Sequence, residues 1–216
     1  MIYSPGRRYI FVHAPKTGGT SLALMLEDRA MKDDIMLGDT PKALNRRGKV
    51  KDLSTSGRLW KHSMLTDLYG LIPPEHMREF FVFSLVRNPF DRLVSYYHWL
   101  QVQSFDHPAV TASKAMKFND FLRNPIVIKA ISANPYTRYV TDKDGVMQAD
   151  HFIRLEQLRD DLAPLEAHLD LKFKQVHHAN ASDRGDDYRS YYDSALVDHV
   201  AKACAADIAR FGYSFE

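Results

Sequence analysis

Two short apolar runs constrain the fold of this chain more than any other feature. Residues 9–13 (YIFVH) and 80–86 (FFVFSLV) are rich in β-branched and aromatic side chains and contain few polar positions. A strand with one solvated face alternates apolar and polar residues, whereas a strand buried on both faces is apolar throughout. The two runs therefore predict central strands of a mainly parallel sheet.

A turn and then a helical pattern follow each of these runs. Thr20 and Ser21 are predicted to cap the first helix, and Pro89 fits the first turn of the second, where proline is tolerated. The apolar stripes are Leu22, Met25 and Leu26 in the first helix and Leu93, Tyr97 and Leu100 in the second. The sequence thus predicts the order strand, loop, helix twice.

The C-terminal part of the chain continues this alternation. Residues 151–155 are predicted to form a strand, and Pro164 marks a break or restart in the leucine-rich helix that follows. A final helix is predicted to end at Gly212 and to bury one face made of Val197, Val200, Cys204, Ile208 and Phe211. Strands that alternate with helices predict an α/β three-layer sandwich with a mainly parallel central sheet.

Length and composition predict one domain over residues 1–216. A hydrophobic content of 45% is enough for a full core. Cys204 is the only cysteine, which excludes an intrachain disulfide and a cysteine-based zinc site. Neither a signal-peptide-like stretch nor an apolar run of membrane-spanning length is present, so we expect a soluble, cytoplasmic protein without a transmembrane segment.

Helical and strand periodicity fades between residues 38 and 62. The net charge of +2 is too small to indicate a nucleic-acid partner, so an anionic ligand must be met by a local patch. This segment has two acidic residues, Asp39 and Asp52, and seven basic ones: Lys42, Arg46, Arg47, Lys49, Lys51, Arg58 and Lys61. We expect a mobile basic insertion, with an ordinary solvated loop as the alternative.

The loop after the first strand, HAPKTGGTS at residues 13–21, contains the parts of an anion cradle. Gly18 and Gly19 allow the backbone to approach a ligand, and Lys16 supplies a positive charge. Hydroxyl donors come from Thr17, Thr20 and Ser21. In the nucleoside-triphosphate P-loop the lysine follows the last glycine, whereas here it precedes both, so that motif is not matched. A glycine turn beside an exposed lysine is the alternative.

A second anion site is predicted in RNPFDRLVSYY at residues 87–97. Arg87 leaves the end of the strand, Arg92 lies one turn into the helix, and Ser95 follows on the same face. The planar guanidinium of arginine suits phosphate oxygens better than an ammonium group does. In the alternative interpretation, Asp91 and neighbouring carboxylates simply pair with these arginines.

HAPKTGGTS and RNPFDRLVSYY together resemble the sulfotransferases that use 3′-phosphoadenosine 5′-phosphosulfate (PAPS). The first motif is more similar to the Golgi carbohydrate sulfotransferases and their bacterial relatives than to the aryl and steroid enzymes. RLEQL (154–158), NAS (180–182), YRSYYD (188–193) and DIARFGYSF (207–215) extend the resemblance. It implies a P-loop nucleoside-triphosphate-hydrolase-like form of the fold, with PAPS as donor and its desulfated product PAP.

The same resemblance assigns roles to individual residues. Lys16 and the loop through Ser21 are implied to hold the 5′-phosphosulfate, and Arg87 and Ser95 the 3′-phosphate, while Arg92 matches the second arginine of the family pattern. The complete donor-binding set is Lys16, Thr17, Gly18, Gly19, Thr20, Ser21, Arg87, Arg92, Ser95, Asn180, Ser182 and Tyr188. Lys16 is also expected to act in catalysis, by stabilising the leaving oxygen.

His62 is the predicted general base, since it lies where glycan 2-O-sulfotransferases place a histidine and since histidine titrates near neutrality. Glu156 is the reserve candidate. Four other histidines are given different roles: His13 is expected to buttress the loop, His98 in the second helix to be structural, and the adjacent His177 and His178 to be exposed or nucleotide-side. No carboxylate or histidine cluster suggests a metal site, so no metal is expected.

The acceptor is predicted to be a carbohydrate hydroxyl or amine, and the basic segment suits a uronic-acid-containing or sulfated glycan. Two other functions remain open at this level. A nucleotide kinase on the same fold would need a Walker lysine that the sequence lacks. A non-catalytic nucleotide-binding protein would need only the phosphate cradle.

Overall fold

The structure is a computed structural model that describes residues 1–173, 185 and 187–216. The described residues group into two compact units. The first contains residues 1–86 and 136–173, and the second contains residues 87–135, 185 and 187–216. Each unit has its own hydrophobic core. Asn180 and Ser182, as well as His177 and His178, lie outside the described residues.

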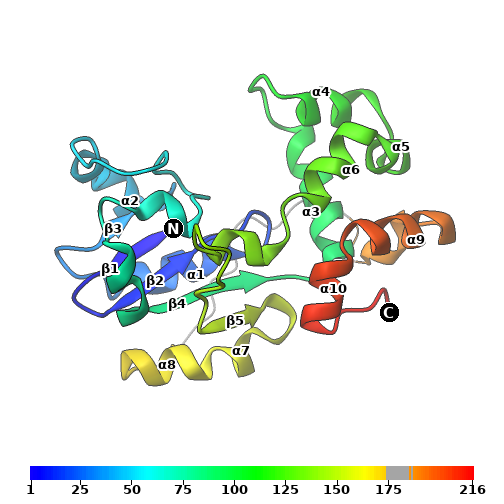
Figure 1. Ribbon diagram of the computed structural model, residues 1–216. Coiled ribbons are helices and arrows are strands. Elements are labelled where there is room, and N and C mark those ends of the chain that lie inside the picture. The colour runs from blue at the N-terminus through cyan, green and yellow to red at the C-terminus, as the bar shows by residue number, and fades with distance from the viewer. Residues whose placement is uncertain (174–184, 186) are drawn as a thin grey trace. The chain divides into compact units, whose positions relative to one another are not determined.

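The first unit is built on a five-stranded sheet with strand order β3-β1-β2-β4-β5 (Figure 1). The strands are β1 (Ile2–Ser4), β2 (Tyr9–Val12), β3 (Ile35–Met36), β4 (Phe81–Val86) and β5 (His151–Arg154). Strands β2, β4 and β5 pair in parallel, with Phe11 opposite Phe83 and Phe83 opposite His151. All three strands predicted from the sequence are therefore confirmed, within a residue or so at their ends.

The prediction of a mainly parallel sheet is only partly right, because the sheet is mixed. Strand β1 pairs antiparallel with both β2 and β3. Strand β1 has three residues and β3 has two, which is too short for a periodic pattern to stand out from the sequence. Their pairing depends on contacts between distant parts of the chain, such as Ile2 opposite Met36.

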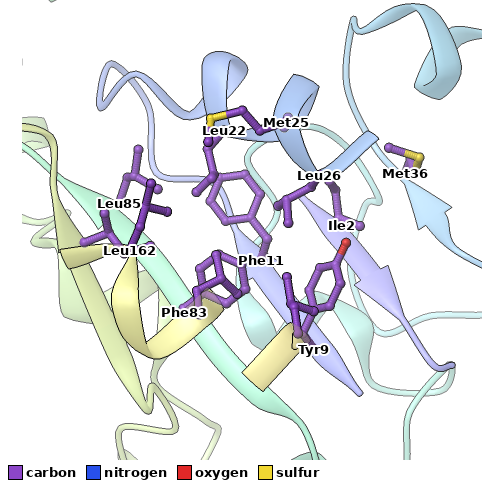
Figure 2. Packing of buried hydrophobic residues seen from close by; sticks show 14 of the residues in the cluster. Ile2, Tyr9, Phe11, Leu22, Met25, Leu26, Met36, Phe83, Leu85 and Leu162 are labelled. Atoms are coloured by element: carbon purple, nitrogen blue, oxygen red, sulfur yellow. The ribbon is translucent and has the colours of Figure 1, made fainter. Parts of the chain in front are cut away.

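Helices α1 (Gly19–Glu27), α7 (Leu158–Asp161) and α8 (Ala163–Leu169) supply one side of the first core. Their leucines pack with alternate residues of the strands, and Figure 2 shows Leu22 and Met25 beside Phe11, and Leu162 near Leu85. The rings of Phe11 and Phe83 stack with their centroids 5.3 Å apart. A proline stands in the first turn of α8, as the predicted helix restart requires.

The remaining elements of the first unit are short. They are α2 (Pro41–Asn45) and the 3₁₀ helices η1 (Arg47–Val50), η2 (Leu65–Leu68), η3 (Pro74–Glu79), η4 (Tyr136–Val140) and η5 (Leu155–Gln157). Helix η4 packs against β4, whose Val82 and Val86 are buried along with Ile10 and Val12 of β2. Strands β2 and β4 are thus buried on both faces, as their apolar runs predicted.

The second unit is helical in the part that the structure describes. It contains α3 (Pro89–Gln101), α4 (Pro108–Ala115), α5 (Phe118–Arg123), α6 (Pro125–Ser132), η6 (Tyr188–Tyr191), α9 (Ser194–Ala203) and α10 (Ala205–Phe211). The prediction of one final helix is wrong, because the non-helical backbone of Cys204 (φ −105°, ψ 17°) divides it into α9 and α10. The predicted stop at Gly212 is confirmed by its left-handed conformation, φ 67°.

We expect the stacked rings of Phe11 in β2 and Phe83 in β4 to contribute strongly to the stability of the first unit. Replacing Phe83 by alanine would leave a cavity beside Phe11 and should lower the free energy of unfolding by about 3 to 5 kcal/mol. Val102→Ala, at a position that is 79% exposed, is the control and should change stability by less than about 0.5 kcal/mol. Urea unfolding followed by circular dichroism measures both, and equal effects would contradict this account.

Candidate functional site

The loop between β2 and α1 is held in shape by its own residues. The Thr17 hydroxyl is fully buried and donates to the carbonyl oxygen of Ala14 at 2.8 Å. Lys16 adopts the left-handed conformation, with φ 65°, which is uncommon for a residue with a side chain. Thr17 therefore supports the loop through its side chain, and what it offers a ligand is its backbone N–H.

The two glycines occupy positions where no other residue fits without rearrangement. Gly18 is left-handed (φ 79°), and a Cβ there would lie 2.7 Å from Leu155 Cδ1. A Cβ on Gly19 would collide with the imidazole of His13. The prediction that Thr20 and Ser21 cap α1 is wrong: Gly18 is the N-cap, and both hydroxyl residues lie in the first turn of the helix. The first backbone N–H groups at the N-terminus of α1 are therefore those of the two glycines.

His62 is bound to the residue that opens this loop. Its Nδ1 lies 2.8 Å from the carbonyl oxygen of His13, and the two imidazole rings meet edge to face with their centroids 4.7 Å apart. A carbonyl oxygen only accepts hydrogen bonds, so Nδ1 carries the proton and Nε2 carries the lone pair. This tautomer is the one in which Nε2 acts as a base. His13 itself is buried against Gly19, which agrees with its predicted buttressing position.

Burial keeps both histidines neutral. It lowers the pKa of His62 to about 4, although the hydrogen bond to His13 acts in the opposite direction. Burial, and then neighbouring positive charge, likewise holds the pKa of His13 well below its usual range. At neutral pH the Nε2 lone pair of His62 is therefore available.

Lys61 connects the basic segment to the loop, a contact that the sequence analysis did not predict. Its Nζ donates to Thr20 Oγ1 at 3.0 Å and to both carboxylate oxygens of Asp39 at 2.7 and 2.8 Å. Burial would raise the pKa of Asp39, but the hydrogen bonds and charge of Lys61 outweigh it and lower that pKa. The one sequence signal for this contact was that Lys61 directly precedes His62, the predicted base.

Three of the predicted phosphate-binding residues of the second unit lie along the beginning and middle of α3: Arg87 precedes it, and Arg92 and Ser95 are within it. Asn88 caps this helix by accepting from the N–H of Phe90 at 3.1 Å, and Ser95 is buried. Arg87 donates from Nε and Nη2 to Asp91 Oδ2 at 2.8 and 2.6 Å. This ion pair is the alternative that the sequence left open for Arg87, and it fixes the orientation of the guanidinium.

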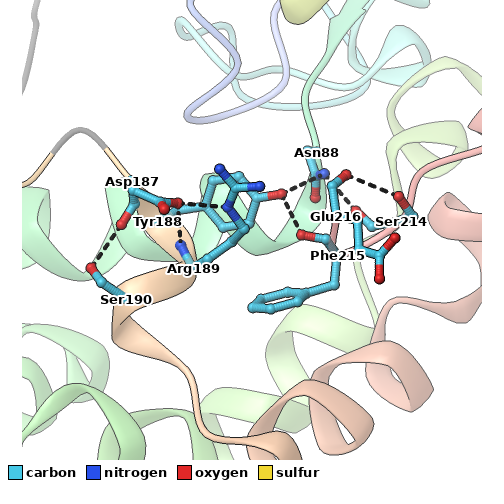
Figure 3. A network of polar contacts seen from close by, with 8 residues as sticks. All are labelled: Asn88, Asp187, Tyr188, Arg189, Ser190, Ser214, Phe215 and Glu216. Atoms are coloured by element: carbon cyan, nitrogen blue, oxygen red, sulfur yellow. Dashed lines mark hydrogen bonds and ion pairs between the residues drawn. The ribbon is translucent and has the colours of Figure 1, made fainter.

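Tyr188 joins a polar network at the same helix start (Figure 3). Its hydroxyl donates to the carbonyl oxygen of Phe215 at 2.8 Å and lies 3.3 Å from Asn88 Nδ2. Asn88 Nδ2 in turn donates to the carbonyl oxygen of Ser214 at 2.8 Å. Tyr188 and Asn88 therefore tie the end of the described chain to α3, a role that sequence reasoning did not assign to either residue.

The predicted site residues thus fall into two groups. The structure brings Lys16, Thr17, Gly18, Gly19, Thr20 and Ser21 together with His62 in the first unit, and Arg87, Arg92, Ser95 and Tyr188 lie in the second. Glu156, the reserve base, lies in η5 beside Leu155, whose side chain faces Gly18. No group of metal-binding side chains occurs among residues 1–173, 185 and 187–216. No helix within these residues has the length and apolar character of a membrane span.

Comparisons with known proteins assign the chain to a family. Residues 1–214 match the model of the Sulfotransferase family, so the chain belongs to that family and is a sulfotransferase. Among solved structures it is similar to the crystal structure of mouse sulfotransferase SULT7A1 complexed with PAP. That similarity has a TM-score of 0.45 and 15% identity, and covers 95% of this chain and 85% of the other. No curated protein matches the chain.

The contact between Gly19 and His13 generates a prediction about stability. Gly19→Ala must push the buried imidazole out of place and should lower the free energy of unfolding by about 1 to 3 kcal/mol. Gly48→Ala is the matched control, because a Cβ there meets nothing within 4 Å and its effect should stay within about 0.5 kcal/mol. Thermal and urea unfolding measure both variants. A Gly19→Ala protein as stable as the control would show that the loop tolerates the side chain.

The low pKa of His62 predicts a stability that depends on pH. Unfolding restores its ordinary pKa near 6.5, so the unfolded chain binds more protons between pH 4 and 6.5 and stability rises with pH across that window. The full effect is on the order of 3 kcal/mol. His62→Asn should reduce the rise measured by urea unfolding from pH 4.5 to 7.5 and leave the share that comes from the buried His13, and the exposed His76→Asn is the control. The same slope in the parent and His62→Asn would contradict the burial of a neutral imidazole.

Proposed function

We propose that this sulfotransferase transfers the sulfuryl group of PAPS to a carbohydrate hydroxyl, with His62 as the general base. The observation that carries the proposal is the strand–loop–helix unit at residues 9–27. There Lys16 precedes a nine-residue helix whose N-cap, Gly18, and first residue, Gly19, are both positions where a side chain would collide with a neighbour. A loop of this kind binds an anion by backbone donors, helix dipole and lysine charge together.

The loop residues have distinct tasks in the proposed donor site. The loop from Lys16 to Ser21 holds the 5′-phosphosulfate through the N–H groups of residues 17–20, because the N–H of Ser21 donates to the carbonyl oxygen of Gly18 at 3.0 Å. Lys16 stabilises the oxygen that leaves with PAP. Arg87, Arg92 and Ser95 are proposed to hold the 3′-phosphate, and Asn180, Ser182 and Tyr188 complete the predicted donor set. We also propose the three-layer, P-loop nucleoside-triphosphate-hydrolase-like form of the fold. The packing of α1, α7 and α8 in the first core and of η4 against β4 supports it.

In the reaction, the acceptor oxygen forms a bond to sulfur while the bond from sulfur to the phosphate oxygen breaks. His62 Nε2 takes the acceptor proton, and its Nδ1–H remains bonded to the carbonyl of His13. A base with a pKa of about 4 has little driving force to deprotonate a free hydroxyl. The proton therefore moves as the new bond to sulfur forms and makes the hydroxyl acidic. Lys16 supplies its charge at the other end of the transfer.

Transfer of labelled sulfate from PAPS to glycan acceptors tests this function. His62→Asn should lose about 10² to 10⁴ in single-turnover rate, because no base remains to take the proton, while PAP affinity stays near the parental value. The parental rate should change little from pH 5.5 to 8 and fall as the pH approaches 4, where His62 becomes protonated.

Two outcomes would contradict the proposal. Retention of more than about a tenth of the parental rate by His62→Asn would remove His62 as base and direct attention to Glu156. Stabilisation by ATP and Mg²⁺ that exceeds stabilisation by PAP, in a thermal-shift series, would favour a phosphotransferase instead.

A further inference from the structure

The basic residues of the segment at 38–62 do not form a uniform cationic surface. Several of them are engaged with backbone carbonyls of the first unit: Lys42 with Glu27, Arg46 with Met31 and Asp34, and Lys49 with Lys32. Lys61 is engaged with Asp39 and Thr20. These side chains hold the segment to the scaffold, so the sequence overstated the charge that is available to a ligand.

Arg58 differs from those residues. Its guanidinium lies over the indole ring of Trp60, 6.0 Å from the ring centroid, and it makes no salt bridge with any residue that the structure describes. A guanidinium stacked on an aromatic ring keeps its N–H donors for an external acceptor such as a carboxylate or sulfate. The cation thus sits on an aromatic platform with its hydrogen-bonding capacity available.

Trp60 is itself unusual, since 47% of this large apolar side chain is exposed. Its indole meets the imidazole of His62 edge to face, with the centroids 5.2 Å apart. The turn beneath it is well fixed: the fully buried Ser63 accepts from the N–H of Trp60 at 2.8 Å and donates to the carbonyl of Arg58 at 2.9 Å. An exposed tryptophan on a rigid turn, in contact with the proposed base, has the properties of a binding platform.

We propose that Arg58 and Trp60 form the acceptor-binding surface and that it selects an acidic glycan. This inference rests on the proposed function. The indole of Trp60 packs against the apolar face of a pyranose ring, and Arg58 binds the carboxylate or sulfate group of the same or the adjoining sugar. Because Trp60 touches His62, a sugar on this platform places a hydroxyl beside the proposed base.

A pair of hexasaccharides separates the two contributions. One alternates glucuronic acid with N-acetylglucosamine, and the other contains N-acetylglucosamine alone and is neutral. Binding to the PAP-loaded full chain is measured by calorimetry, and transfer from labelled PAPS gives KM and kcat. Trp60→Ala should weaken binding of any hexasaccharide that the parent binds by about tenfold or more, and Trp60→Phe should restore most of it.

Arg58 is expected to contribute to binding only through its attraction to the acidic groups of the glycan. Arg58→Gln should weaken binding of the acidic hexasaccharide by about tenfold and change the affinity for the neutral one by less than about twofold, with kcat preserved in both cases. Arg47→Gln removes another exposed charge of the same segment, and Trp99→Ala removes another partly exposed tryptophan, so these are the matched controls. PAP affinity should stay at the parental value in every variant, which confirms folding and the donor site.

The outcomes distinguish this inference from the function on which it rests. Affinities for the acidic hexasaccharide within about twofold of the parent in both Trp60→Ala and Arg58→Gln would overturn it, as would a parent that does not bind that hexasaccharide. Binding that depends on both residues but leads to no sulfate transfer would uphold the surface and overturn the proposed reaction.

Discussion

The close approach of the Gly19 backbone to the His13 imidazole is the contact on which the arrangement of the first unit's site depends. It brings Gly19, the first residue of α1, against His13, the residue that opens the loop, so the two ends of the loop are packed against each other. The carbonyl of the same His13 then holds Nδ1 of His62. One steric constraint thus positions the proposed anion-binding loop and the proposed base together.

The histidines and the lysine near this loop shape its electrostatics in different ways. Burial removes the charge of His13 and His62, which makes Nε2 of His62 a lone-pair donor across the physiological range. The Nζ of Lys61 is hydrogen-bonded to the carboxylate of Asp39 at the edge of the same region. The electrostatic character of the site therefore comes from a few placed charges, and the total of +2 says little about it.

Strong local patterns allowed part of the fold to be predicted. The continuous apolar runs of β2 and β4 and the proline in the first turn of α3 each state a local preference that the tertiary structure kept. Short β1 and β3 had no such pattern, and the break at Cys204 interrupts an apolar stripe that continues on either side. The helix cap at Gly18 was missed because hydroxyl residues nearby satisfied the usual rule.

The sequence by itself determined that an α/β sheet carries a glycine-rich, lysine-containing loop before a helix, because strand and helix periodicities and glycine requirements are local. Only the tertiary structure decided how the polar residues are used. His62 lies 49 positions from His13, and Lys61 lies 41 positions from Thr20, yet these pairs are hydrogen-bonded. Whether a histidine is neutral, or a lysine structural, depends on burial and on partners distant in the chain, which no local pattern specifies.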